Sequence, residues 1–239
     1  RLLMIALDGA DGALLDTLSA DGTLPNLAAL RARGQAKYLS APAGITDDGL
    51  WASFQYSKGL GEHGRYYFRQ RMRSGRFGMA HGEEADREAF WDGLSRDGCR
   101  VAVFDVPKCR LPRSLNGIHL ADWIVHGHYF AEPKSHPASL ASEVVERFGP
   151  EPPSICGQES GSPDDDEVLE VARNLHISAA RNHDASLNYH SSEAWDLFLV
   201  GFKEAHCAGH TLWDFADSSH PCHDAVRNAE LGEPFLSIL

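Results

Sequence analysis

The sequence predicts an α/β fold in which helices flank a mostly parallel central sheet. Three dense apolar runs support this prediction, over residues 1–7, 100–107 and 195–202. Such runs are typical of strands covered on both faces, which is the usual state of strands in parallel sheets. Residues 87–107 add a helix, a glycine turn and a strand in that order, which is one half of a crossover connection between parallel strands.

The first run predicts a central strand, buried on both faces, that ends at Asp8-Gly9. In open α/β sheets, ligands bind beyond the carboxyl ends of the strands, and a glycine there lets backbone and substrate approach closely. Asp8 is therefore a candidate ligand for a metal or a phosphate site. The alternative is that Asp8 caps the next helix or closes a turn.

The length and composition predict one domain over 1–239. A chain of 239 residues with 43% hydrophobic composition can bury one sizeable core, or one core with a smaller insertion. The proline-rich stretch at 149–153 is the best candidate boundary, and we expect a cap or insertion over about 112–160. Oligomeric state is not predicted.

Charge and cysteine content narrow the function classes. A net charge of −12 argues against binding of nucleic-acid polymers or anionic membranes, and no stretch is as long as a membrane span. An anionic substrate would therefore need a local device such as metal ions. Five cysteines without a CxxC pair indicate reduced thiols and a cytoplasmic location.

Thr46 is the candidate nucleophile. It lies in a glycine- and proline-containing loop that runs into a predicted helix. A hydroxyl just before a helix N-terminus has backbone N–H donors and the positive dipole end beside it, which are the surroundings needed to attack phosphorus. The alternative is an ordinary N-cap, the commoner fate of threonine at such a position.

Several motifs in combination resemble the alkaline phosphatase superfamily, most closely its type I phosphodiesterase and nucleotide pyrophosphatase branch. The resemblance covers about residues 1–110 and 195–215, and implies that Asp8 binds a metal and that Thr46 is both nucleophile and metal ligand. The motifs are the first strand with Asp8-Gly9, Leu24-Pro25-Asn26-Leu27, Thr46 followed by Trp51-Ala52-Ser53, and His63-Gly64.

The sequence departs from the family pattern after Thr46. Asp47-Asp48 stand where the family has small or proline residues, and their negative charge would oppose a phosphate or help to hold a cation. Asp47, Trp51 and Arg65 are secondary candidates for contact with substrate. Arg65 opens a basic, aromatic segment over 65–84, which either faces the anionic substrate or is a solvated loop.

A second group of candidate metal ligands follows the apolar run at 195–202. His206 and His210 are four residues apart, so on a helix they share one face and can reach a single zinc ion. Glu204 is close enough to ligate or to orient a ligating histidine. In the resembled family an aspartate stands four residues before this histidine; His210 matches the histidine and His206 replaces the aspartate. The alternative is two polar residues on a helix.

Residues 116–134, with His126 and His128, indicate a loop over the active-site face. No Asp-His dipeptide occurs in the sequence, although the family's second metal needs one. We therefore expect the final strands and the remaining ligands to lie outside these 239 residues.

The resemblance implies a metal-dependent phosphoesterase that hydrolyses phosphodiester or pyrophosphate bonds of a small anionic substrate through a phospho-threonine intermediate. Two divalent ions would assist, zinc given the histidine ligands, with manganese as the alternative. A sulfatase-like or phosphomonoesterase member of the superfamily is one rival, although no cysteine lies in the Cys-x-Pro-x-Arg setting of sulfatases. A non-catalytic module with a degenerate metal site is the other rival.

Overall fold

A computed structural model describes residues 1–41, 47–67, 69–72, 74–79, 88–124, 132–153 and 163–239, with the backbone alone at Asp47 and Met79. The strands are β1 (Leu2–Leu7), β2 (Arg69–Arg71), β3 (Phe77–Met79), β4 (Val101–Phe104), β5 (Gly117–Ala121), β6 (Lys134–His136) and β7 (Leu197–Phe202). The helices are α1 (Gly12–Ala20), α2 (Pro25–Ala32), α3 (Asp47–Tyr56), α4 (Leu60–His63), α5 (Phe90–Arg96), α6 (Leu140–Phe148), α7 (Asp165–Ser192), α8 (Glu204–Ala216), α9 (Ala225–Glu230) and the short η2 (Leu236–Ile238).

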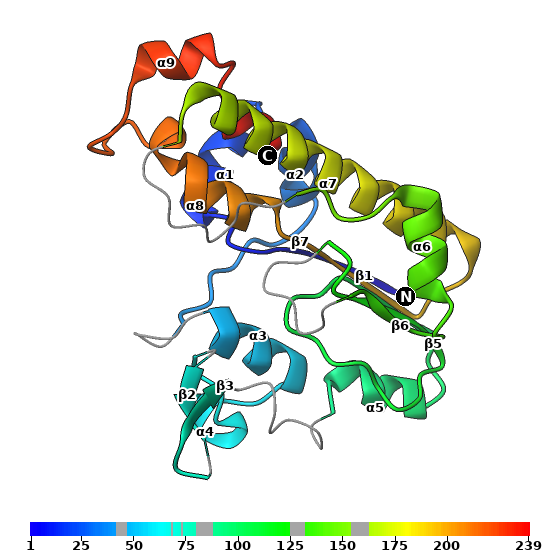
Figure 1. Cartoon of the computed structure of the whole chain (residues 1–239). Coiled ribbons are helices and arrows are strands. Elements are labelled where there is room, and N and C mark those ends of the chain that lie inside the picture. The colour runs from blue at the N-terminus through cyan, green and yellow to red at the C-terminus, as the bar shows by residue number, and fades with distance from the viewer. Residues whose placement is uncertain (42–46, 68, 73, 80–87, 125–131, 154–162) are drawn as a thin grey trace.

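Five strands form the central sheet in the order β1-β7-β4-β5-β6. The first four are parallel, and only β6 is antiparallel to its neighbour. Figure 1 shows α6, α7 and α8 on one side of this sheet and α3 and α5 on the other. The predicted α/β class with a mostly parallel, helix-flanked sheet is therefore confirmed.

The alternation of side chains along β4 divides the core between the two faces of the sheet. Ala102 and Phe104 point into a cluster with α6 and α7, whereas Val101 and Val103 pack with Trp91 of α5. A third cluster joins α7 to α8. Because both faces of β4 and β7 are covered, the ends of these strands are firmly positioned.

The first strand was predicted to be central, and this prediction is wrong. β1 is at the edge of the sheet and pairs only with β7 within the described ranges. Leu2, Leu3, Ile5 and Leu7 remain 47–58% exposed. A continuous apolar run has the same pattern at an edge as at the centre of a sheet, so it cannot distinguish the two positions.

The predicted loop over 116–134 is also wrong in part, because Gly117–Ala121 within it form β5. His119 faces the core with no exposed surface, and the Trp123 that follows is equally buried. His126 and His128 lie outside the described residues. The expected insertion over about 112–160 includes β5, β6 and α6, and the division into domains stays a prediction.

The longest helix among the described residues is α7. Asp164 caps it by accepting a hydrogen bond from the Glu167 backbone N–H, and the acidic first turn favours the positive end of the helix dipole. In the part of the chain that the structure describes, no helix is long and apolar enough to span a bilayer.

Candidate functional site

The parallel pairing of β1 and β7 brings two distant parts of the sequence together. Leu7 is opposite Phe202, and the Asp8 backbone N–H donates to the Phe202 carbonyl over 2.8 Å. Asp8 therefore lies beside the start of α8, where His206 occupies the first turn and His210 the next.

Gly9 makes this close approach feasible. Its φ is +65°, and a Cβ atom there would lie 2.8 Å from both Cα and Cβ of His206. Such a separation is shorter than any normal carbon contact, so only glycine lets the turn after β1 pack against α8 in this way.

We predict that Gly9→Ala lowers the free energy of unfolding by about 1–3 kcal/mol, because it combines an unfavourable φ with a backbone clash. Gly22→Ala is the matched control, since Gly22 also has a positive φ but nothing within 4 Å of its Cβ position. Urea denaturation of both variants measures the difference. Equal losses would show that the contact with His206 is easily relaxed.

Four predicted residues meet at this edge. The Trp51 indole N–H donates to Asp8 Oδ1 over 2.9 Å, and Asp8 Oδ2 lies 3.2 Å from His206 Nδ1. His206 Nε2 in turn lies 2.9 Å from His210 Nε2. Asp8 is buried, His206 is largely buried and His210 is exposed, so the two imidazoles are reached from solvent with the carboxylate behind them.

Glu204 is set apart from the imidazole pair by its burial. It begins α8 and is 4% exposed, and neither of its carboxylate oxygens has a hydrogen-bond partner in the described chain. Burial raises the pKa of Glu204, and nearby polar groups that include the Ser178 hydroxyl of α7 oppose part of this rise. Among the residues described, no three His, Cys, Asp or Glu side chains are grouped to hold a metal ion.

The negative charge of Asp48 is neutralised in the interior. Arg65 Nη2 lies 2.9 Å from Asp48 Oδ1, and Lys108 Nζ lies 3.2 Å from Asp48 Oδ2, with all three side chains at most 7% exposed. Arg65, a candidate for substrate contact, is thus turned into the protein. Thr46 and the Asp47 side chain lie outside the described residues, although α3 begins directly after Thr46.

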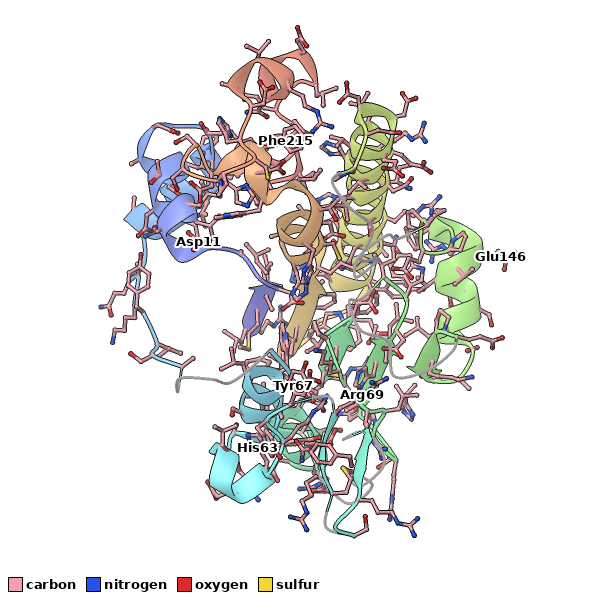
Figure 2. The ribbon with its side chains drawn as sticks, turned by 60° about the vertical axis from the view of Figure 1, so that its left-hand side comes forward. Asp11, His63, Tyr67, Arg69, Glu146 and Phe215 are labelled. Carbon is pink, nitrogen blue, oxygen red and sulfur yellow. The ribbon has the colours of Figure 1, made fainter. Side chains whose placement is uncertain are left out.

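Two other motif residues, Ser53 and His63, form a structural link between α3 and α4. His63 Nδ1 accepts a hydrogen bond from the Arg65 backbone N–H over 3.1 Å. Its Nε2 therefore carries the ring proton and donates to Ser53 Oγ over 2.9 Å. Figure 2 shows His63 near the bottom of the view and Phe215 of α8 near the top.

Sequence reasoning missed Asp105, which follows β4 as Asp8 follows β1. Asp105 is 1% exposed and accepts hydrogen bonds from the backbone N–H groups of Trp123 and Ile124. Burial raises its pKa to about 7, against the opposing effect of those N–H groups and of Lys203. The same signal that drew attention to Asp8, an acid directly after a buried strand, would have found it.

No protein-family model matches the sequence, and no similar protein was found among curated proteins. The fold is similar to the crystal structure of phosphonoacetate hydrolase from Sinorhizobium meliloti 1021 in complex with phosphonoformate, with a TM-score of 0.54 and 15% sequence identity. The alignment covers 99% of this chain and 51% of that one, so the chain spans about half the length of the similar protein. At this identity the similarity establishes the fold.

Proposed function

We propose that this chain carries part or all of the active site of a metal-dependent phosphoesterase that hydrolyses phosphodiester or pyrophosphate bonds. The observation that carries the proposal is the pair of imidazole nitrogens, 2.9 Å apart, at the carboxyl end of β7 beside Asp8. This is the edge at which open α/β sheets bind ligands. The fold is similar to that of a phosphonoacetate hydrolase, which is consistent with the same broad class.

The imidazole pair supplies two of the donors that a divalent metal needs, and the described residues add no third His, Cys, Asp or Glu ligand to them. Two Nε2 atoms that face each other are a donor set suited to zinc, with manganese as the alternative when carboxylates join. His206 and His210 would hold one ion, and the family resemblance adds Asp8 and Thr46 as metal ligands and a second ion. When bound, such ions polarise the phosphoryl oxygens and lower the pKa of a coordinated hydroxyl.

Thr46 would act as the nucleophile. Its hydroxyl gives its proton to solvent and its oxygen forms a bond to phosphorus as the bond to the leaving-group oxygen breaks, which gives a phospho-threonine that keeps the other substituent on phosphorus. Water then hydrolyses the bond between phosphorus and the threonine oxygen, which restores the hydroxyl. Because α3 begins at Asp47, the backbone N–H groups of its first turn would stabilise the phosphoryl oxygens.

We predict that Thr46→Ala lowers turnover of bis-p-nitrophenyl phosphate by at least about 1,000-fold in zinc-loaded protein, since no other group replaces the nucleophile. Thr46→Ser should keep part of the activity. Thr17→Ala, an exposed hydroxyl on α1, is the control and should match the wild type. A folded, metal-replete Thr46→Ala protein that turns over as fast as the wild type would exclude Thr46 as nucleophile.

The choice of substrate class is tested with a panel. The compounds are bis-p-nitrophenyl phosphate, p-nitrophenyl phosphate for the monoesterase alternative and p-nitrophenyl sulfate for the sulfatase alternative. Phosphonoacetate is added because the similar structure is a phosphonoacetate hydrolase. We expect the phosphodiester to be hydrolysed fastest. Faster phosphonoacetate cleavage would reassign the substrate, and zinc binding without turnover of any compound would favour the non-catalytic module.

A further inference from the structure

We infer that the outer face of the β2–β3 hairpin is a docking surface for a short acidic segment of a partner protein. We call this face, with Arg69, Arg71, Arg76 and Phe77, the basic ribbon. The inference goes beyond the proposed phosphoesterase function and is independent of it, since it involves neither the metal site nor Thr46.

The local charge of the hairpin is the first observation. Residues 65–79 contain five arginines and no Asp or Glu, in a chain whose net charge is −12. The side chains of Arg69, Arg71 and Arg76 are exposed. The basic ribbon is therefore a cationic surface on a strongly acidic chain, and a group that complements its charge is an anion.

The register of the two strands determines which side chains face outward. Gln70 pairs with Gly78, and Arg71 pairs with Phe77. Because successive side chains of a strand alternate between its faces, Arg71 and Phe77 share the face opposite to Gln70. Gln70 is 8% exposed, whereas Phe77 is 81% exposed. The face with the arginine and the phenylalanine is thus the one that meets solvent.

The inner face attaches the hairpin to the rest of the protein. The Gln70 side chain donates from Nε2 to the Gly64 carbonyl over 2.7 Å, and its Oε1 accepts the Tyr66 backbone N–H over 3.0 Å. Arg65, between those two residues, pairs with Asp48 of α3. Figure 1 shows the hairpin beneath α3 and next to α4. These contacts hold the outer face in place before a partner binds.

The chemistry of the cations favours carboxylates as their partners. All five basic residues of 65–79 are arginines, and a guanidinium binds a carboxylate through two parallel N–H···O hydrogen bonds. Arginine and aromatic residues are also enriched in protein–protein interfaces, from which lysine is depleted. Exposed arginines beside an exposed Phe77 therefore fit a peptide that carries carboxylates and an apolar side chain.

The size of the basic ribbon favours a short segment over a nucleic acid. Each strand has three residues, so the ribbon is about 10 Å long. A nucleic-acid strand would extend beyond it, and the phosphates outside the ribbon would be repelled by the negative charge of the remaining chain. A short acidic peptide needs to contact the ribbon alone.

The test is fluorescence anisotropy of the full chain with a labelled peptide of sequence Glu-Glu-Phe-Glu-Glu. We expect this peptide to bind with a dissociation constant below about 1 mM. Its affinity should fall as sodium chloride is raised from about 50 to 500 mM, because salt screens exposed charges. The uncharged analogue Gln-Gln-Phe-Gln-Gln should bind at least about 10-fold more weakly. Lack of binding by the acidic peptide, or equal binding of the two peptides, would overturn the inference.

Variants locate the bound peptide on the protein. The double variant Arg71→Gln/Arg76→Gln should weaken binding of the acidic peptide at least about 10-fold, because both carboxylate partners are lost. Arg96→Gln is the matched control, since Arg96 is an exposed arginine of α5, outside the basic ribbon, and should bind like the wild type. Wild-type affinity in the double variant would overturn the inference.

A labelled decathymidylate tests the alternative class of partner in the same assay. We expect it to bind more weakly than the acidic peptide. Tighter binding of the oligonucleotide would assign the surface to nucleic acid and overturn the inference. None of these measurements requires a metal or turnover, so their failure is distinguishable from failure of the proposed phosphoesterase function.

Discussion

Asp48→Ala is expected to lower the free energy of unfolding by about 3–5 kcal/mol, because it removes the carboxylate between two buried cations. Arg65 and Lys108 are 1% and 7% exposed at the side chain and approach opposite oxygens of Asp48. Taking away one charge of a buried cluster leaves the others without the partner that offset their desolvation. Chemical denaturation measures the loss.

Asp16→Ala provides the matched control for Asp48. Asp16 also pairs with an arginine, Arg31, but their side chains are 38% and 32% exposed. Exposed pairs contribute at most about 1 kcal/mol. If the two alanine variants lose the same stability, the buried cluster does not anchor α3 to the loop after β4.

His119→Leu is expected to stabilise the protein, and to do so more strongly in acid. Neither ring nitrogen of His119 has a hydrogen-bond partner within the described chain, and the residue has no exposed surface. Burial, aided by His136, lowers the pKa of His119 from 6.5 to about 3. The folded protein therefore excludes a proton that the unfolded chain binds, so stability is lost as pH falls from 6.5 toward 3.

Replacing the imidazole by leucine removes this penalty. The stability advantage of His119→Leu over the wild type should be about 2 kcal/mol larger at pH 5.0 than at pH 7.5, as measured by urea denaturation. Asp105 acts in the opposite direction, since its raised pKa makes stability fall as pH rises from about 4 toward 7. Because Asp105 is present in both proteins, its contribution to the pH dependence of stability cancels when the two are compared. An advantage that is independent of pH would show that His119 binds its proton in the folded state.

Local patterns predicted the fold class because dense apolar runs are typical of parallel strands, and two of the three runs, those of β4 and β7, are buried on both faces. The apolar runs at 1–7, 100–107 and 195–202 correspond to β1, β4 and β7, and their parallel pairing followed from the intervening helices. They could not give the order of strands, because an edge strand and a central strand of a parallel sheet carry the same residues. β5 was missed because His119 interrupts its apolar pattern, although the side chain is buried.

For the candidate site, the sequence indicated which residues lie near one another but not the contacts between them. The helical spacing of His206 and His210 and the position of Asp8 at a strand end were enough to expect them at one edge of the sheet. The contact of Asp8 with Nδ1 and the Trp51 hydrogen bond depend on Gly9 and on the register of β1 against β7, which are tertiary properties. The burial of Arg65 against Asp48 likewise had no local signal.

The central claim is tested most directly by acid quenching the zinc-loaded chain during turnover of bis-p-nitrophenyl phosphate, followed by mass spectrometry of its peptides. The account predicts a nitrophenyl phosphate ester on Thr46, which is absent from His210→Ala. Sustained turnover with Thr46 never modified, or an equal adduct in His210→Ala, would contradict it.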